Sequence, residues 1–435
     1  MSIPLNTCLG LPGLDRPTNR CRHLDQVRAE LAPLLDRIAT GTLQRELDGE
    51  LPFEPVRWLK EAGYGALRVP TEYGGRGLSI PELTQTWVEL AAADANLPQA
   101  FRGHFALAED RLWQHGRAAD QRGWFARFVA GEIAGNAWSE VGSTAIDTQR
   151  TVLTRDPGDP SAYVLDGTKY YTTGSIFAEW ADVLVRLAPS DPHSAGEDHD
   201  LAIAIVDTRA AGVTVVDDWD GFGQKGTGSG TTAFAGVRVD PDHVLPFEDR
   251  FPFQTALYQL NLLATLVGIG RAAVAETVAH VRARERNYSH ANAARVRDDP
   301  QVLARVGEIA SRVYVAEAAT LRVAAAIQDV ADAVREDEPR ILRLNEEAEI
   351  EASAAQVVVT DLVLQATSDL FDTLGASATA RTRGLDRHWR NARTVSSHNP
   401  RILKARVVGE YVVNGTPPPY AWGIGATRRG QKLPR

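Results

Sequence analysis

The sequence predicts an α+β protein in which a helical domain, an all-β domain and a helical bundle follow one another along the chain. Near both ends of the chain, apolar residues recur every three to four positions, which is the period of an amphipathic helix. The middle of the chain contains short β-branched segments separated by Gly, Asp and Pro. At roughly 150 residues per domain, 435 residues are enough for two or three domains.

The N-terminal helical domain is expected over residues 25–133, after an extension over residues 1–24. One apolar face begins this domain and contains Leu24, Val27, Leu31, Leu34, Leu35 and Ile38. The connector RVPTEYGGRGLS at residues 68–79 interrupts the helices, because its Pro and Gly residues favour turns over helix interiors.

The β domain is expected over residues 134–249, as a barrel or sandwich, with a polar hairpin loop at residues 189–200. Its strands are predicted in the segments TVLTR, AYVLDGTKYYTTG, ADVLVRLA, LAIAIVDT, GVTVVDDW and TAFAGVRV.

A four-helix bundle with a C-terminal tail is expected over residues 250–435. Its longest apolar stripe runs through Val302, Leu303, Val306, Ile309, Ala310, Val313 and Ala316.

Composition argues against several classes of protein. The chain has 47 basic and 56 acidic residues and a net charge of −9, so nucleic-acid binding is not expected. Cys8 and Cys21 lack metal-ligand spacing and suit a reducing compartment. No leader-like segment is recognised, and the most apolar stretch, residues 260–270, is too short to span a bilayer. We therefore expect a cytoplasmic protein that does not bind a membrane.

The segment GFGQKG at residues 221–226 matches the dinucleotide-binding pattern by letters only. That pattern needs a strand before it and a helix after it, and here strand-like sequence follows. Three other segments are more informative: GNAWSE at residues 135–140, GTKYYTTG at residues 167–174 and DDWDGFGQKGTGSGTT at residues 217–232. Their small and hydroxyl residues allow backbone groups to approach a flat polar ligand, with Trp219 over a ring face, although ordinary Gly-rich turns have the same composition.

Together with EYGGRGLS, these three segments and the domain order resemble the acyl-CoA dehydrogenase superfamily of flavoproteins over roughly residues 25–420. The resemblance implies a flavin between the β domain and the bundle, and a homotetramer in which an adjacent subunit reaches the flavin phosphate. Dehydrogenases of this family need a carboxylate to remove the α-proton of a thioester. Neither RNARTVSSHNP at residues 390–400 nor the stretch at residues 255–270 contains an acidic residue.

The segments LDRHWRN, RNARTVSSHNP and VVNGTPP instead resemble the flavin-dependent monooxygenase branch, which includes the dibenzothiophene monooxygenases and sulfur-acquisition oxidoreductases. This resemblance implies a two-component system in which a separate flavin reductase supplies reduced flavin. Dioxygen then forms a C4a-(hydro)peroxyflavin, and one oxygen atom is inserted into a small aromatic, sulfur- or nitrogen-containing substrate. FMN is expected, because TLGASATARTRG has a single glycine at the family's adenosine-binding turn; FAD is the other possibility.

The same resemblance implies specific residue roles. The expected catalytic residues are His398, His104, Asn136 and Thr173, where Thr173 replaces a serine near flavin N5 and Val395 replaces a further histidine of the family. The expected cofactor-binding residues are Asn136, Ser139, Thr173, Trp219, Arg286 and Gly375. Apolar walls of the substrate pocket are expected from Phe101, Phe105 and Trp138. For His104, between Phe101 and Phe105, a structural role in the core is an equal alternative. No metal and no charged anchor for a carboxylate or phosphate is expected.

Two alternative functions remain open on the sequence alone. The same fold could carry an FAD-dependent acyl-CoA dehydrogenase or oxidase, or it could be a scaffold without catalysis. The His398 segment and the missing acidic residue favour the monooxygenase over the dehydrogenase, and the presence of Asn136, Arg286 and His398 argues against a scaffold without catalysis.

Overall fold

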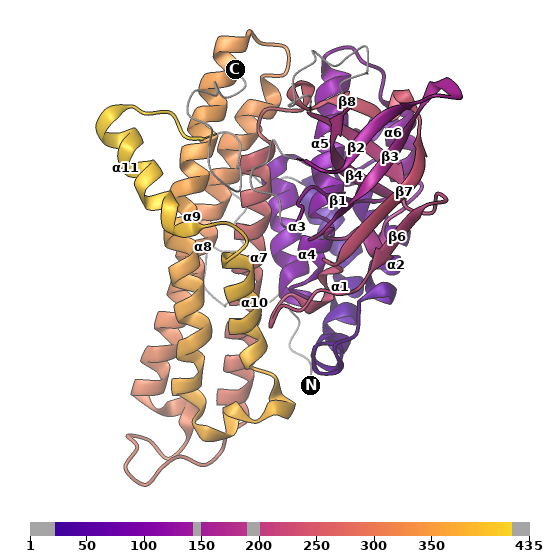
Figure 1. Ribbon diagram of the computed structural model, residues 1–435. Coiled ribbons are helices and arrows are strands. Elements are labelled where there is room, and N and C mark those ends of the chain that lie inside the picture. The colour runs from indigo at the N-terminus through magenta and orange to yellow at the C-terminus, as the bar shows by residue number, and fades with distance from the viewer. Residues whose placement is uncertain (1–21, 142–148, 189–200, 420–435) are drawn as a thin grey trace.

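The computed structural model describes residues 22–141, 149–188 and 201–419. The N-terminal helices lie between the bundle on one side and the sheet on the other (Figure 1). Residues 1–21 of the expected extension, residues 420–435 of the expected tail and the hairpin loop at residues 189–200 fall outside the described residues.

The N-terminal part is helical as predicted. Its helices are α1 (Arg22–Asp48), α2 (Phe53–Glu61), α3 (Ile80–Ala93), α4 (Leu97–Ala100), α5 (Arg102–Gly116) and α6 (Arg122–Val129). The predicted connector forms turns between α2 and α3, with Gly74 and Gly77 at positive φ. The Ser79 hydroxyl then accepts the Glu82 N–H, and the Glu82 carboxylate accepts the Ser79 N–H, so a capping box begins α3.

The described strands of the middle part form one eight-stranded sheet, and side chains from most of its strands meet in a common apolar core, as in the expected β domain. They are β1 (Ala134–Ala137), β2 (Val152–Asp156), β3 (Asp159–Lys169), β4 (Trp180–Leu187), β5 (Leu201–Asp207), β6 (Val213–Val216), β7 (Thr231–Val239) and β8 (Val244–Pro246). The order is β6-β7-β3-β2-β4-β5-β8, and β1 pairs in parallel with β4. One face of β4 and β5 packs on α5 and α6, through Leu184, Ile203, Ile205, Leu107, Phe125 and Phe128.

One strand is shorter than its sequence suggested. The segment GTKYYTTG was expected to be a strand throughout, but β3 ends at Lys169. Tyr171 has a φ of 60°, a left-handed conformation that strands do not contain. The residues that follow Lys169 therefore turn away from the sheet and bring Thr173 to the start of β1, where the Asn136 N–H donates to the Thr173 carbonyl.

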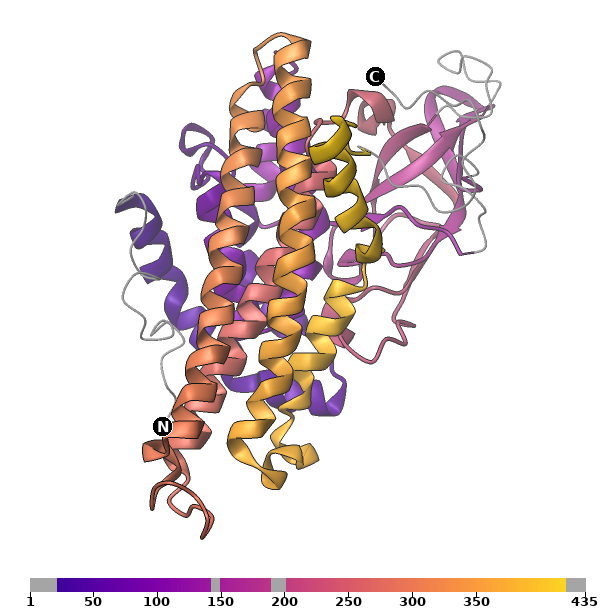
Figure 2. The ribbon, with the colours of Figure 1, turned by 90° about the vertical axis from the view of Figure 1, so that its left-hand side faces the viewer.

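The C-terminal part consists of three long helices and two short ones. They are α7 (Gln254–Ala283), α8 (Pro300–Asp332), α9 (Glu338–Leu374), α10 (Asp386–Ser396) and α11 (Lys404–Asn414). Figure 2 shows α8 and α9 side by side along the face of the bundle. Among the described helices, α7 alone is long and apolar enough to cross a membrane, but 78% of its most apolar window is buried within the protein. It is the central core helix, packed between α3 and the other bundle helices.

The contact between α3 and α7 depends on Gly268. A Cβ atom at this position would lie 2.3 Å from the Ala91 Cβ and 2.5 Å from the Val88 carbonyl oxygen. We expect Gly268→Ala to lower the free energy of unfolding by about 1–2 kcal/mol, because overpacking outweighs the gain in helix propensity. Urea denaturation of the purified protein measures this.

Gly307→Ala in α8 is the matched control. A Cβ atom at Gly307 meets nothing within 4 Å, so the same substitution should raise stability by about 0.5–1 kcal/mol through helix propensity alone. Equal effects of the two substitutions would contradict the proposed close contact.

Candidate functional site

Asn136 and Thr173 lie together at the junction of the helical domain and the sheet. The backbone N–H of Asn136 donates to the Thr173 carbonyl oxygen at 3.1 Å. Gly103 in α5 packs on the same strand, since a Cβ atom there would be 2.8 Å from the Asn136 nitrogen. The Asn136 side chain is buried, and its Oδ1 has no hydrogen-bond partner among the described residues. Such an orphan acceptor suits a ligand that supplies a donor.

A chain of hydroxyl groups begins at Thr173. Its Oγ1 lies 2.8 Å from the Ser229 Oγ, which lies 2.7 Å from the Thr227 Oγ1, and the Thr227 hydroxyl donates to the Gln224 carbonyl at 2.8 Å. Each hydroxyl has one proton. Because Thr227 gives its proton to a carbonyl, Ser229 donates to Thr227. Thr173 in turn donates to Ser229 at 2.8 Å rather than to the Tyr171 carbonyl, which lies farther away at 3.4 Å. The Thr173 hydroxyl oxygen can therefore only accept a hydrogen bond from a further partner.

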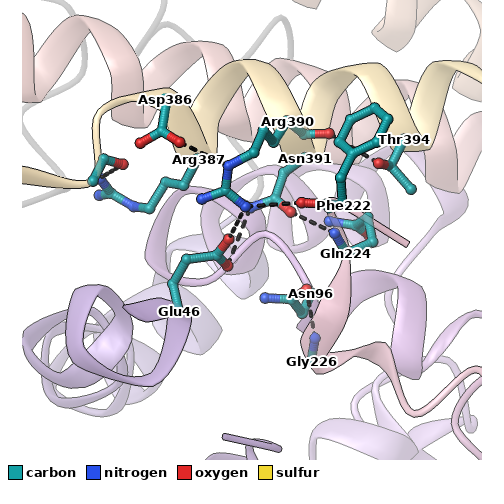
Figure 3. A network of polar contacts seen from close by, with 12 residues as sticks. Glu46, Asn96, Phe222, Gln224, Gly226, Asp386, Arg387, Arg390, Asn391 and Thr394 are labelled. Carbon is teal, nitrogen blue, oxygen red and sulfur yellow. Dashed lines mark hydrogen bonds and ion pairs between the residues drawn. The ribbon is translucent and has the colours of Figure 1, made fainter. Parts of the chain in front are cut away.

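The Gly-rich loop that carries Trp219 is held by polar contacts from α10 and from the turn between α3 and α4 (Figure 3). The Gln224 N–H donates to the Asn391 Oδ1 at 2.6 Å, and the Gly226 N–H donates to the Asn96 Oδ1 at 3.1 Å. Arg390 donates to the Phe222 carbonyl at 2.9 Å and forms an ion pair with a carboxylate on α1, Glu46.

Trp219 is half-buried within this loop. Its Nε1–H donates to the Gln224 carbonyl at 3.1 Å, and its ring lies edge-to-face with Tyr171 at a centroid distance of 5.8 Å. The loop therefore fixes the indole on the side of the sheet where Tyr171 and Thr173 leave β3. In the same region the backbone of Ser139 forms an antiparallel β-bridge with Tyr170, whose N–H donates to the Ser139 carbonyl.

His398 follows α10 and lies against the start of α7. The neighbouring Asn399 donates to the Gln259 Oε1 at 2.6 Å, which holds this segment on α7. The His398 side chain is exposed. The protein around it and the charge of Arg102 nevertheless lower its pKa to about 3. The imidazole is therefore neutral at neutral pH.

His104 has no ring nitrogen free for a ligand. Its Nε2 bonds to the Gly65 carbonyl oxygen at 2.7 Å, and its Nδ1 accepts the Ala134 N–H at 3.3 Å. The side chain is fully buried, and burial lowers its pKa to about 4. The structure thus places His104 against the first residue of β1, Ala134, which lies two residues before Asn136. Backbone groups engage both of its ring nitrogens.

The three predicted pocket aromatics divide into two groups. Phe101 and Phe105 have no exposed surface and pack edge-to-face on Tyr64, at centroid distances of 5.4 and 5.8 Å. They belong to the buried core next to the site and have no surface that a substrate could contact. Trp138 is half-buried, and its Nε1–H donates to the Asp182 Oδ1 at 3.0 Å.

Asp182 is a buried carboxylate that sequence reasoning missed. It pairs with Asn136 in the register of β1 and β4. Its second oxygen lies 2.8 Å from the Arg250 guanidinium, so Arg250 and Trp138 occupy both oxygens. The available signal was an aspartate inside the apolar strand segment ADVLVRLA, because a buried acid needs a partner.

Arg286 and Gly375 lie at the end of the bundle remote from the sheet, where the loop after α7 meets the end of α9 (Figure 1). Arg286 is exposed, and Gly375 borders a hollow of about 540 Å³ that also contains Tyr288 and Arg284. Within one chain, the structure does not bring these two residues together with Asn136 and Thr173.

A separate cavity of about 280 Å³ opens between α1, α3, α7 and α10. It is lined by several carboxylates, Asp36, Glu46, Asp94 and Glu276, and contains none of the predicted site residues. The unpartnered amide oxygen of Asn136 therefore marks the candidate site better than the cavity does.

The burial of His104 has a consequence for stability. Its ordinary pKa is 6.5 and its pKa in the fold is about 4, so unfolding takes up a proton between these values. The contribution of His104 to stability is complete above pH 6.5 and should fall by about 3 kcal/mol as the pH drops to 4. Urea denaturation at several pH values should show this slope. It should be shallower in His104→Gln, and unchanged in His290→Gln, which alters an exposed histidine.

Models of the acyl-CoA dehydrogenase domains match the chain in the order of its three parts. The N-terminal domain matches residues 24–132, the middle domain residues 137–237, and the C-terminal domain residues 260–400. Together these matches cover most of the chain.

Individual relatives are similar over most of their length. The dibenzothiophene monooxygenase of Rhodococcus qingshengii is 30% identical over 385 residues, which cover 83% of this chain and 86% of that protein. The probable FMNH2-dependent monooxygenase SfnC of Pseudomonas putida is 26% identical over 395 residues, or 88% of this chain and 94% of that protein.

A solved structure of TdsC, a dibenzothiophene monooxygenase from Paenibacillus sp. A11-2, contains FMN and indole. It is 30% identical, has a TM-score of 0.80, and the match covers 91% of this chain and 98% of that one. The chain therefore belongs to the acyl-CoA dehydrogenase family and, within it, to the branch of flavin-dependent monooxygenases.

Proposed function

We propose that this protein binds reduced FMN from a separate flavin reductase and uses dioxygen to insert one oxygen atom into a small organic substrate. The observation that carries the proposal is the unpartnered amide oxygen of the buried Asn136 beside the Thr173 carbonyl, next to a buried Asp182 that is paired with Arg250. His398 adds a neutral imidazole. The FMN in TdsC and the FMNH2 dependence in the name of SfnC support the choice of cofactor.

The described residues fit a flavin. The orphan Asn136 Oδ1 and the Thr173 oxygen offer two acceptors, and Trp219 offers an aromatic face on the same side of the sheet. Ser139 and Gly375 stay in the proposed cofactor-binding set. Arg286 would reach the phosphate from an adjacent subunit, which is why we propose a homotetramer. The cytoplasm is the proposed location, because reduced flavin must be supplied there by the reductase.

When bound, the reduced flavin supplies the two electrons that activate dioxygen, so that one oxygen atom enters the substrate and the other leaves as water. The protein has to position the flavin, keep water out and avoid protonating the flavin edge too early. Asn136 and Thr173 can orient the flavin without donating an acidic proton. Neutral His398 can accept a proton from the substrate. His104 is assigned a positioning role, because it holds β1 rather than a ligand.

The paired carboxylate argues against dehydrogenation of a thioester on the same fold. A dehydrogenase needs a free carboxylate to take the α-proton. Near Asn136 the described structure offers Asp182, whose two oxygens already face Trp138 and Arg250. The alternative of an FAD-dependent dehydrogenase or oxidase predicts a yellow purified protein that an acyl thioester bleaches.

The reaction itself is tested with His398→Ala. Purified protein, a flavin reductase, NADH, FMN and isotopically labelled dioxygen are incubated with panels of phenols, sulfides and amines, and mass spectrometry detects a singly oxygenated product. We expect His398→Ala to reduce product at least 100-fold while FMN binding stays within a few-fold, because loss of a general base removes about 10²–10⁴ in rate. His280→Asn, in the bundle, is the control and should behave as the unmodified protein. Absence of labelled product from every substrate panel would refute the proposed reaction.

The direction of the hydroxyl chain predicts a preference for the reduced cofactor. Reduced flavin carries a proton on N5, which the Thr173 lone pairs can accept, whereas oxidised flavin offers N5 only as an acceptor. Ser229→Ala frees the Thr173 proton to donate. We expect oxidised FMN to bind the variant about five- to tenfold more tightly, so that its affinity approaches that of reduced FMN, since one hydrogen bond is worth about 1 kcal/mol.

Calorimetry with oxidised FMN, and with reduced FMN under anaerobic conditions, measures both affinities. Ser161→Ala, which removes an exposed hydroxyl of β3, is the control. An unchanged ratio of the two affinities in Ser229→Ala would show that Thr173 does not face N5 in this way.

A further inference from the structure

Arg102, the first residue of α5, differs from the other buried arginines of the described chain. Its side chain is 4% exposed, its Nε has no hydrogen-bond partner, and no carboxylate among the described residues forms an ion pair with it. The other buried arginines each contact a carboxylate: Arg111 with Asp110, Arg250 with Asp182, Arg271 with Glu317, and Arg387 with Glu276.

The surroundings of Arg102 belong to the candidate site. The guanidinium lies over the Tyr258 ring, 4.6 Å from its centroid, and the buried Tyr258 hydroxyl also lacks a hydrogen-bond partner. On α7, Tyr258 precedes Gln259, which holds the His398 segment through Asn399. On α5, the next residue after Arg102 is the glycine that packs on the Asn136 strand. Arg102 therefore stands between the Asn136 strand and the His398 segment.

An unpaired buried guanidinium is costly, because removal from water is not offset by a nearby negative charge. The ring of Tyr258 offsets only part of this cost, since cation–π attraction is weaker than a charge-assisted hydrogen bond. The cation is therefore suited to a negative group that enters from outside. The planar fork of arginine matches carboxylates and other oxyanions in particular.

We propose that Arg102 binds an anionic oxygen group of the substrate, so that the protein acts on small organic acids, carboxylates or sulfur oxyanions, with their remaining part directed towards Asn136 and Thr173. The proposal rests on the function proposed above. It replaces the sequence-based expectation that the pocket has no charged anchor. The flavin phosphate is a different anion, assigned to Arg286 at the remote end of the bundle.

The test compares anions with neutral analogues in full-length protein, with and without oxidised FMN. Calorimetric titrations use carboxylates from formate to benzoate, the corresponding sulfinates, and the matching amides. We expect at least one acid to bind tenfold or more tightly than its amide. Arg102→Met should remove that difference, since each charge-assisted bond contributes strongly to affinity. Arg117→Met, at the exposed far end of the same helix, should leave it within twofold.

Thermal denaturation separates an anchor from a structural cation. A cation without a structural partner destabilises the empty protein, so Arg102→Met should keep or raise the denaturation midpoint. Bound acid should raise the midpoint of the unmodified protein but not that of the variant. A lower midpoint of the empty variant would overturn the proposal, as would equal binding of acids and amides by the unmodified protein.

Two further outcomes separate this proposal from the proposed function. If Arg102→Met weakens FMN binding and leaves the affinity for acids unchanged, the cation serves the cofactor and the anchor is wrong. If acids bind through Arg102 but no labelled oxygen enters any of them, while neutral substrates are oxygenated, the oxygenase stands and the substrate class is wrong. If acids bind and nothing at all is oxygenated, the proposed function fails and the anion site remains.

Discussion

The contact between α5 and β1 at Gly103 determines the geometry of the whole candidate site. The helix backbone approaches the Asn136 strand so closely that a single methyl group at this position would meet the strand backbone. Because Gly103 is fixed on one side, its two neighbours in the chain project to defined places. His104 bonds to the Gly65 carbonyl and the Ala134 N–H and so ties the strand to the first domain. Arg102 reaches the Tyr258 ring on α7.

Cations lie beside the buried carboxylates around this contact. Asp110, Asp182 and Glu317 are each held by an arginine. Glu349 is buried and faces the Lys404 ammonium, and burial raises the pKa of its carboxyl. Each of these four carboxylates thus has a cation beside it. The amide oxygen of Asn136 and the Arg102 Nε have no partner among the described residues, and a hydroxyl chain and a neutral imidazole accompany them. This set suits an oxygen-transferring flavin better than proton abstraction from carbon.

The order of domains and most of the helices and strands could be predicted from the sequence, because periodicity reports directly on local structure. The long apolar stripes of α8 and α9 and the apolar segments of β4 and β5 are of this kind. The end of β3 was missed because the positive φ of Tyr171 leaves no trace in composition. The single-sheet topology depends on pairings between distant strands and was likewise inaccessible.

The site residues show the same limit more sharply. Asn136 and Thr173 were named from their segments, and the structure does bring them together. Local sequence could not show that both nitrogens of His104 are occupied, since Gly65 and Ala134 are distant in the chain. Arg102 was overlooked because its distinguishing property is a missing partner, which only three-dimensional packing reveals. Arg286 and Gly375 were named from the family resemblance, and within the chain they lie by the loop after α7 and the end of α9, away from Asn136 and Thr173.

The same missing partner connects the anchor to the chemistry. The protein around the exposed His398 and the charge of Arg102 lower the pKa of its imidazole, which is therefore neutral and a weak proton acceptor when the site holds no anion. An oxyanion paired with Arg102 cancels part of that field and so raises the pKa of His398. On the proposed assignment, His398 becomes a stronger proton acceptor only when an acid is bound, which restricts proton movement near the flavin to complexes that contain a substrate.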